Sequence, residues 1–229
     1  MPSYLRTSAP EFDKDHNSMI ATRRQFLASS VAAAAFAVLP LSPALAQTIN
    51  GLFDDIPLKD RILGDVNAPV TIVEYASMTC PHCKSFHEKI LPEIKTKYID
   101  TGKAKLIMRP FPFDGDRRGE AGFMLALCAP NDAYYPMVDA IFAMQDKLRT
   151  SPTVVDDLRQ VSKMAGMTED QFTKCLSGGE PELYSQMIQG RNRAVRDFKV
   201  SATPTIFVNN QKLGDSRLET ISEAIEAAL

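Results

Sequence analysis

The chain has 229 residues, of which 45% are hydrophobic and 24% are charged, and its formal net charge is −2. This composition is ordinary for a globular protein and excludes a wholly disordered chain. The length accommodates one substantial domain with an insertion, or two small domains. Because the charge is near neutral and no basic stripe is present, we expect no binding of nucleic acid.

Residues 1–46 have the layout of an export signal. A basic pair, Arg23-Arg24, precedes an apolar run from Phe26 to Leu41, and Ala44-Leu45-Ala46 is a small-residue cleavage pattern. The letters TRRQFL around the basic pair resemble a twin-arginine box, which favours that export route over general secretion. The apolar run has about 16 residues and contains Pro40, whereas a membrane-spanning helix needs about 20, so an uncleaved anchor is the weaker interpretation.

We therefore expect cleavage after Ala46 and a periplasmic location for the mature chain, residues 47–229. Met1 and Met19 are both possible starts, because Met19 to Ala46 would be a signal of usual length. The mature chain keeps a net charge of −3 and contains all four cysteines. An even number of cysteines in an exported protein favours disulfide bonds.

After a short lead-in, residues 47–60, the pattern predicts a strand, a helix and a second strand. The letters NAPVTIVEYAS, residues 67–77, are largely apolar without clean alternation, as in a strand that is buried on both faces. From Phe86 to Tyr98 apolar residues recur every four positions, which predicts a helix that Pro92 kinks. We place the core of the second strand at Lys105–Met108, because the prolines that follow cannot donate to a sheet ladder.

From about Asp116 to Lys199 the pattern is helical, and strand character returns only afterwards. The expected helices are Arg118–Cys128, Tyr135–Leu148, Thr153–Ala165, Thr168–Leu176 and Pro181–Phe198. A strand at Thr205–Val208, a turn at Asn209-Asn210 and a second strand at Gln211–Leu213 are expected to form a hairpin, and Ser216–Leu229 a closing amphipathic helix. The mature chain is thus expected to be a small α/β sheet domain that is interrupted by an all-helical insertion at about residues 116–199.

Two cysteines in the letters CPHC directly follow the first predicted strand. A zinc site built on Cys80, Cys83 and His87 would need a fourth ligand, and Cys128 and Cys175 each stand alone far downstream. A purely structural bridge within CPHC is also disfavoured, because so short a loop restrains the unfolded chain little. We therefore expect a redox-active pair, with no metal and no other cofactor.

The position of Cys80 at the start of a helix favours thiol–disulfide exchange. Unpaired backbone N–H groups and the helix dipole stabilise an anion there, so the thiolate should form well below the ordinary pKa of about 8.5. His82, between the two cysteines, is expected to stabilise the thiolate further, and the alternative is an exposed imidazole without a role. A lower thiolate pKa stabilises the reduced dithiol and makes the disulfide a stronger oxidant.

With these features the sequence resembles the DsbA-like, thioredoxin-fold disulfide oxidoreductases of bacterial envelopes. The tetrapeptide CPHC matches the active site of that family, and Glu74, six residues before Cys80, matches its buried acid. Thr203-Pro204, just before a predicted strand, matches the cis-proline loop that faces the dithiol. The helical stretch matches the family's inserted helical domain. The resemblance covers essentially all of the mature chain and implies a thioredoxin-like α/β fold.

The resemblance also implies a role for each of these residues. Cys80 would be the exposed nucleophile that forms a mixed disulfide with a client protein, and Cys83 would be the buried partner that closes or reopens the bridge. Glu74 would relay a proton to or from Cys83, and a carboxylate in a buried strand beside thiols is costly unless it is used or paired. Pro204 would hold a cis peptide that places backbone groups of Thr203 to pair with an extended client segment. From spacing alone, a solvated Glu74 and an ordinary strand-leading Pro204 stay open as alternatives.

Cys128 and Cys175 lie in the predicted helical insertion, and we expect a second, structural disulfide between them. Such a bridge would enclose 46 residues, a loop long enough to restrain the unfolded state. Similar bridges occur in some members of the family the chain resembles. Free buried thiols and a redox-coupled second pair are the alternatives.

Two features disagree on the direction of exchange. The CPHC tetrapeptide favours an oxidase, whereas Thr203 is more typical of isomerases and reductases, because strongly oxidising members often have Val at that position. Residues 47–68, which precede the first confident strand, are too few for the dimerisation region that isomerases usually carry. We therefore favour a monomeric dithiol oxidase.

Such an oxidase would donate its disulfide to unfolded or newly exported cysteine-containing proteins and would be reoxidised by a membrane partner. One alternative is an isomerase or reductase of the same fold. The other is a non-catalytic envelope protein that binds Cu(I) or acts as a chaperone, although no Met-rich or His-rich tract accompanies the motif.

Overall fold

The computed structural model describes residues 47–130 and 133–229, and the predicted export signal, residues 1–46, lies outside the described residues. A six-stranded mixed sheet in the order β1-β6-β5-β3-β4-β2 forms the centre of the described part. Strands β3 (Val70–Ala76) and β4 (Ala104–Pro110) run parallel side by side. On the other side of β3, β5 (Thr205–Val208) runs antiparallel and turns back into β6 (Gln211–Lys212).

Every residue of β3 is buried, which confirms the prediction of a strand covered on both faces. Side chains of a strand alternate between the two faces of its sheet. Ile72 and Ala76 belong to the larger apolar core, whereas Val73 and Tyr75 belong to a smaller core on the opposite face. Glu74 lies between Val73 and Tyr75 in the chain, so its side chain is directed toward the larger core.

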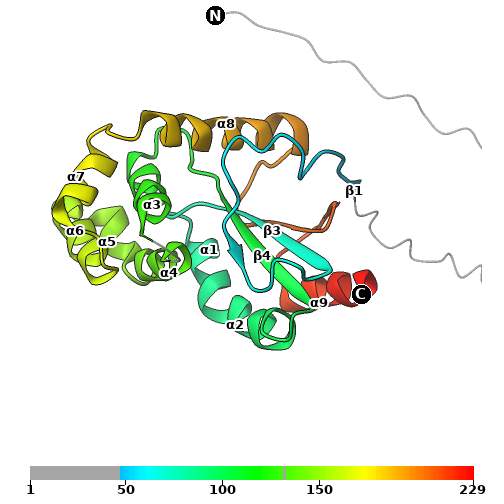
Figure 1. The fold of residues 1–229 in the computed structure, drawn as a ribbon. Helices are drawn as coiled ribbons and strands as arrows, with labels where there is room; N and C mark the ends of the chain where they lie inside the picture. Colours follow the sequence, from blue (N-terminus) through cyan, green and yellow to red (C-terminus); the bar gives the residue numbers. More distant parts are fainter. Residues whose placement is uncertain (1–46, 131–132) are drawn as a thin grey trace, which may run out of the picture. The chain divides into compact units, whose positions relative to one another are not determined.

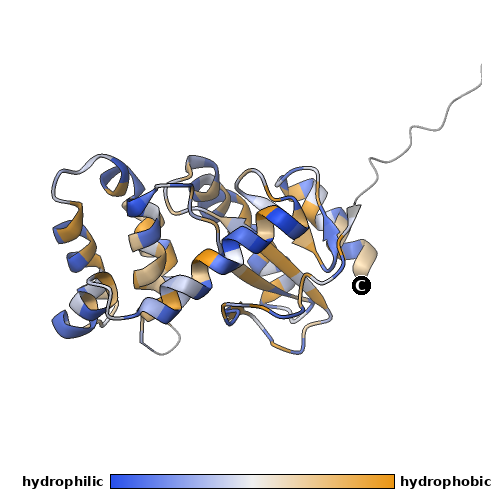
Figure 2. Ribbon diagram, turned by 90° about the horizontal axis from the view of Figure 1, so that it is seen from above, coloured by the Kyte–Doolittle hydropathy of each residue, from blue (hydrophilic) through white to orange (hydrophobic). Residues whose placement is uncertain are grey.

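Helices cover both faces of the sheet (Figure 1). α8 (Pro181–Phe198) crosses one face and contributes Ala194 and Phe198 to the smaller core. α9 (Leu218–Ala228) and the helical segment after β3 cover the other face. Figure 2 shows strands that are mostly hydrophobic, between helices whose outer sides are largely hydrophilic.

The remaining helices between β4 and β5 gather at one end of the sheet (Figure 1). They are α3 (Arg117–Cys128), α4 (Tyr134–Ala143), α5 (Gln145–Thr150), α6 (Val154–Met164) and α7 (Glu169–Leu176). α7 begins with a capping box, in which Thr168 and Gln171 satisfy each other's backbone N–H groups. Together these helices form a compact group that packs beside the end of β3.

One helical segment follows β3 and carries the CPHC letters. It consists of α1 (Pro81–Ser85), the π-helical turn η1 (Phe86–Ile90), α2 (Leu91–Ile94) and the π-helical turn η2 (Lys95–Ile99). Just before Pro92, the Leu91 N–H donates to the carbonyl of Phe86, five residues back. Because Pro92 has no N–H, the regular ladder is interrupted there, and the wide turn accommodates the interruption. The helix expected at 86–98 is therefore present, with π-helical turns on both sides of α2.

Two of the helices predicted after Asp116 differ from the structure by more than one residue at a boundary. The expected helix 135–148 is two helices, because the chain leaves helical geometry at Met144 (φ −98°, ψ 15°). This break directs the side chain of Gln145 into the interior. The closing helix begins at Leu218 and not at Ser216, because Asp215 accepts a hydrogen bond from the backbone N–H of Arg217 and holds a turn before it.

β4 extends beyond the predicted core, Lys105–Met108, as far as Pro110. Proline at the end of a strand loses only its donor, and the ladder continues because the Phe111 N–H donates to the carbonyl of Ala76 at 2.7 Å. The prediction stopped the strand too early for this reason.

Two edge strands that were not predicted precede β3, β1 (Gln47–Thr48) in the lead-in and β2 (Ile62–Leu63) just after it. β1 pairs with β6 and β2 pairs with β4, both antiparallel, so these two strands form the two edges of the sheet. Strands of two residues are too short to show any periodicity in the sequence.

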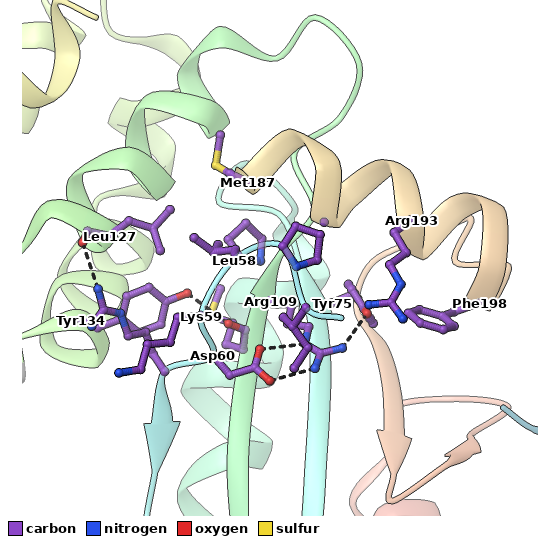
Figure 3. Close-up of a pocket in the computed structure, with 16 residues that line it drawn as sticks. Leu58, Lys59, Asp60, Tyr75, Arg109, Leu127, Tyr134, Met187, Arg193 and Phe198 are labelled. Atoms are coloured by element: carbon purple, nitrogen blue, oxygen red, sulfur yellow. Dashed lines mark hydrogen bonds and ion pairs between the residues drawn. The ribbon is translucent and has the colours of Figure 1, made fainter. Parts of the chain in front are cut away.

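Two arginines tie the lead-in to the sheet and to α8 (Figure 3). Arg109 of β4 donates to both carboxylate oxygens of Asp60 (2.9 and 2.8 Å), to the Leu52 carbonyl (2.8 Å) and to the Tyr75 hydroxyl (3.0 Å). Arg193 of α8 donates to backbone carbonyls of the lead-in. The narrow cavity beside them has no lining residue from the CPHC loop, and each of its three arginines, Arg61, Arg109 and Arg193, donates a hydrogen bond. We therefore assign this cavity to the packing of the lead-in.

Cys128 and Cys175 are joined by a disulfide, with an S–S distance of 2.11 Å and a Cα–Cα distance of 6.3 Å. Cys128 is the last residue of α3, and Cys175 lies in α7. The bridge spans 47 positions of the sequence, so it links the first of the clustered helices to the last.

We expect loss of this disulfide to lower the free energy of unfolding by about 4 kcal/mol, because a cross-link over so long a loop removes closure entropy from the unfolded chain. The variant is Cys128→Ala with Cys175→Ala, made in a background in which Cys80 and Cys83 are alanine so that no thiol can exchange. Denaturant unfolding of the two proteins measures the difference. Equal free energies would show that the bridge does not restrain the unfolded chain.

Candidate active site

Cys80 and Cys83 lie where β3 ends and α1 begins. Cys80 is the N-cap residue of α1, with extended backbone angles (φ −80°, ψ 118°), and Cys83 lies in the first turn of the helix. Both are free thiols in the structure. Cys83 is fully buried, and only 4% of the surface of Cys80 is exposed. The expectation of an exposed Cys80 is therefore wrong, because the loop at Thr203 packs against its sulfur.

The surroundings of the two sulfurs shift their pKa values in opposite directions. The pKa of Cys80 is lowered to about 5, chiefly by a hydrogen bond from the Cys83 thiol. Burial of Cys80 opposes this shift, but the Thr203 side chain and the backbone N–H groups of Cys83 and His82 lower the pKa further. Burial raises the pKa of Cys83 well above its usual range, and the hydrogen bond to Cys80 and the Glu74 carboxylate raise it further. At neutral pH, Cys80 is thus a thiolate and Cys83 a thiol.

Glu74 is completely buried on β3, which rules out the alternative of a solvated strand edge. Its Oε2 lies 2.9 Å from Nε2 of His87, and its Oε1 has no hydrogen-bond partner among the described residues. The carboxylate is close enough to Cys83 to raise the pKa of that thiol. The structure therefore brings Glu74 and the dithiol together.

His87 is the cation that compensates the buried carboxylate. Burial alone would lower the pKa of His87, but the carboxylates of Glu74 and Asp139 outweigh it and raise the pKa to about 9. The sequence suggested His87 only as a zinc ligand. Its spacing was the available signal, because a residue four positions after Cys83 lies on the same helix face.

The Thr203–Pro204 peptide bond is cis and directly precedes β5. The Cys80 thiol donates to the Thr203 carbonyl, with the sulfur 3.3 Å from the oxygen. The Thr203 hydroxyl is buried without a hydrogen-bond partner among the described residues, and the Thr203 side chain lowers the pKa of Cys80. A thiolate cannot donate a hydrogen bond. We therefore assign the Thr203 carbonyl as the acceptor for the thiol form of Cys80, and the Thr203 hydroxyl as a donor to the thiolate form.

His82 is exposed on the first turn of α1. Its backbone N–H is the group through which it lowers the pKa of Cys80. This effect comes from the helix terminus, so another residue type at position 82, proline excepted, would also supply it.

Two side chains from the clustered helices hold the CPHC loop, and neither was predicted from the sequence. The buried amide of Gln145, the first residue of α5, donates to the carbonyls of Met78 and Cys80 at 2.9 Å each. Asp116, the N-cap of α3, also accepts a hydrogen bond from the Thr79 hydroxyl. An N-cap can be recognised from local sequence, but the partner of a buried amide 65 positions away cannot.

This arrangement can exchange disulfides without a bound group. Cys80 supplies a stable thiolate beside a backbone that an extended chain can pair with, and Cys83 supplies a buried thiol that can close the bridge. Within residues 47–130 and 133–229, no cluster of three or more His, Cys, Asp or Glu side chains is placed to hold a metal ion. None of the helices in the described part is long and apolar enough to cross a membrane.

Comparison with known proteins places this geometry in a family. The model of the family described as Thioredoxin matches residues 58–227. The putative protein-disulfide oxidoreductase of Rickettsia bellii (strain RML369-C) is 32% identical over 171 residues, which cover 74% of this chain and 64% of that protein. The chain thus spans less than two thirds of the length of this relative.

Two further proteins resemble the chain over a larger share of their own length. Disulfide bond formation protein D of Bacillus subtilis (strain 168) is 26% identical over 174 residues, which cover 73% of this chain and 76% of that protein. The crystal structure of alpha-DsbA1 from Wolbachia pipientis superposes with a TM-score of 0.67 at 29% identity and covers 74% of this chain and 90% of that one. With its thioredoxin-like sheet, its clustered helices and its CPHC dithiol opposite a cis-proline, the chain belongs to the thioredoxin family, among the DsbA-like proteins.

Proposed function

We propose that this protein is a thiol:disulfide oxidoreductase that acts as a dithiol oxidase and introduces disulfide bonds into exported proteins by exchange at Cys80 and Cys83. The observation that carries the proposal is the opposite shift of the two pKa values, which makes Cys80 a thiolate and keeps Cys83 protonated. A dithiol whose reduced form is stabilised in this way is a strong oxidant as a disulfide. The names of the relatives, a putative protein-disulfide oxidoreductase and a disulfide bond formation protein, support the same reaction class.

In this reaction a client thiolate attacks the Cys80 sulfur of the oxidised protein. The Cys80–Cys83 bond breaks, a mixed disulfide forms between Cys80 and the client, and Cys83 leaves and takes up a proton. A second client thiolate then attacks the client sulfur of the mixed disulfide and releases Cys80 as a thiolate. The client loses two electrons and the dithiol gains them. The low pKa of Cys80 favours the last step, because a stable thiolate is a good leaving group.

We assign roles to the neighbouring residues on the same basis. The backbone of Thr203, before the cis Pro204, would pair with an extended client segment beside Cys80. Glu74 would accept and return the proton of Cys83, because it is buried next to that thiol. The Cys128–Cys175 disulfide would stabilise the helical part without taking part in exchange.

Location and partners complete the proposal. The layout of residues 1–46 favours export to the periplasm with cleavage after Ala46. There the mature chain would act as a monomer on cysteine-containing proteins that have just been exported, and a membrane protein would reoxidise its dithiol.

An isomerase or reductase is the second candidate, and Thr203 favours it. The Thr203 side chain lowers the pKa of Cys80, so this residue influences the stability of the reduced dithiol. The equilibrium of the Cys80/Cys83 pair with glutathione separates the two functions. We expect the reduction potential of this pair to lie well above that of thioredoxins, which is about −270 mV. A reduction potential near the thioredoxin value would contradict the oxidase function.

We expect the Cys80 thiolate to titrate with a midpoint of about 5, followed by its ultraviolet absorbance in the reduced protein. Since this pKa is lowered, the reduced form gains stability over the oxidised form as pH rises from about 5 to about 9, and loses that gain as pH falls through 5. Cys83→Ala removes the strongest donor to the thiolate, so the midpoint of Cys80 should rise. Cys128→Ala with Cys175→Ala, far from this donor, should leave the midpoint unchanged. A midpoint near the ordinary value in the unaltered protein would contradict the proposed electrostatics.

We expect Thr203→Val to raise the pKa of Cys80 and to slow client oxidation without abolishing it, because valine cannot hydrogen-bond to the thiolate but keeps the backbone groups that pair with the client. The measurement is the appearance of disulfides in a reduced, unfolded test protein. Restoration of activity in a scrambled test protein measures isomerisation in parallel. Loss of the second activity alone in Thr203→Val would favour an isomerase.

A further inference from the structure

A buried imidazole pairs with Glu74, the carboxylate that acts on Cys83, and the proposed exchange steps do not use it. His87 stands on η1, and only 2% of its side chain is exposed. Its Nε2 lies 2.9 Å from Glu74 Oε2, and its Nδ1 lies 3.5 Å from Asp139 Oδ1 on α4. Because the Asp139 side chain is 66% exposed, the three groups form a line from the interior of the protein to its surface.

The sheet offers Glu74 no counter-charge. On the neighbouring strands the residues in register with Glu74 are Met108 and Ile206, which are both apolar. The proton on His87 is therefore what neutralises the buried carboxylate, and an unpaired buried charge would be costly.

The rings around His87 keep it from water. The ring of Phe142 lies 4.6 Å from the imidazole, centroid to centroid, and the ring of Phe86 lies 5.8 Å away at a steep angle. In the described part of the chain, the charged groups that act on the imidazole are the carboxylates of Glu74 on β3 and Asp139 on α4. Glu74 acts in turn on three titratable groups, Cys83 of α1 and Tyr134 and Tyr135 of α4, and raises the pKa of each.

We propose that His87 is the proton donor for Cys83. Its Nε2 proton passes through Glu74 to the Cys83 sulfur when that sulfur leaves the disulfide, and the Asp139 carboxylate, 3.5 Å from Nδ1, stabilises the positive charge of the imidazolium. This inference rests on the proposed exchange at Cys80 and Cys83 and adds a residue to it.

The step balances without a further reactant. The attacking thiolate bonds to Cys80, the Cys80–Cys83 bond breaks, and Cys83 leaves with the electron pair. Glu74 gives its newly received proton to Cys83 and ends as a carboxylate, while His87 ends neutral with one proton on Nδ1. A proton from solvent restores the imidazolium before the next turnover. The thiol product is strongly favoured, because burial and Glu74 oppose a thiolate at Cys83.

The test is the reduction of the Cys80–Cys83 disulfide by glutathione, expressed as a rate constant per glutathione thiolate, from neutral to alkaline pH. In the unaltered protein this constant should fall as pH rises through about 9, because the imidazolium is present below its raised pKa and lost above it. In His87→Gln the constant should be lower by about a hundredfold or more at neutral pH, since a positioned general acid contributes at least about that much, and the decrease of the constant near pH 9 should disappear.

Three further variants separate proton donation from a structural role. His87→Lys keeps a positive charge but has a higher pKa, so the fall should move to higher pH. Asp139→Asn removes one of the two carboxylates that raise the pKa of His87, so the fall should move to lower pH. Asp146→Asn is the matched control, because Asp146 is also an exposed carboxylate but pairs with Lys84, and its profile should be unchanged.

A fall that stays at the same pH in His87→Gln would overturn the proposal. If His87→Gln does not fold, Asp139→Asn provides the test, because Asp139 lies at the surface. An unchanged pH profile of the rate constant in Asp139→Asn would also contradict the proposal. Titration of the His87 imidazole by NMR in each folded variant checks that the fall belongs to this residue. If glutathione does not reduce the pair in any variant, the proposed exchange function itself fails, which is a different result.

Discussion

A carboxylate buried in the middle of a strand is the constraint on which the rest of the site depends. Glu74 has no exposed surface, and its in-register neighbours Met108 and Ile206 are apolar. The charge must therefore be met from the helical layer, and His87 meets it at 2.9 Å. This contact fixes the helical segment after β3 against the sheet, since an unpaired charge would be far more costly than lost apolar packing. Cys83, four positions before His87, is thereby held over the same carboxylate.

The two sulfurs differ because of depth and not because of residue type. Cys80 is at the end of the helix, where backbone N–H groups and the Cys83 thiol donate to it, so its charged form is stabilised. Cys83 lies three residues deeper, where burial and Glu74 oppose the charged form. Within four consecutive residues, the helix N-terminus thus makes Cys80 a good leaving group, and the buried Glu74 keeps Cys83 protonated. The difference between the two pKa values therefore depends on the position of the helix N-terminus relative to the sheet.

Parts of the chain that are distant in sequence hold this terminus in place. Gln145 binds the carbonyl groups on both sides of Thr79, and Asp116 binds the Thr79 hydroxyl, so the clustered helices clamp the loop before α1. On the opposite face, Arg109 joins the lead-in to Tyr75, the residue next to Glu74. The helical region therefore covers the site and also sets the position of the carbonyl groups from which α1 begins.

Much of this could be predicted from the sequence, because it depends on neighbours along the chain. Apolar runs located β3 and β5, apolar periodicity located most helices, and the letters CPHC after a buried strand placed Cys80 at a helix start. The even number of cysteines behind an export signal favoured the bridge between Cys128 and Cys175, and resemblance to a family added the cis bond before Pro204. No such local signal marks the two-residue strands β1 and β2, the break at Met144 or the π-helical turns beside Pro92.

Only the tertiary structure decided the contacts that depend on how two surfaces meet. The pairing of Glu74 with His87 crosses from sheet to helix, and the covering of Cys80 by Thr203 joins residues 123 positions apart. Local sequence determines which helix or strand a residue belongs to. Packing determines which residues of different elements share a buried site, and these neighbours set the charge that each side chain carries.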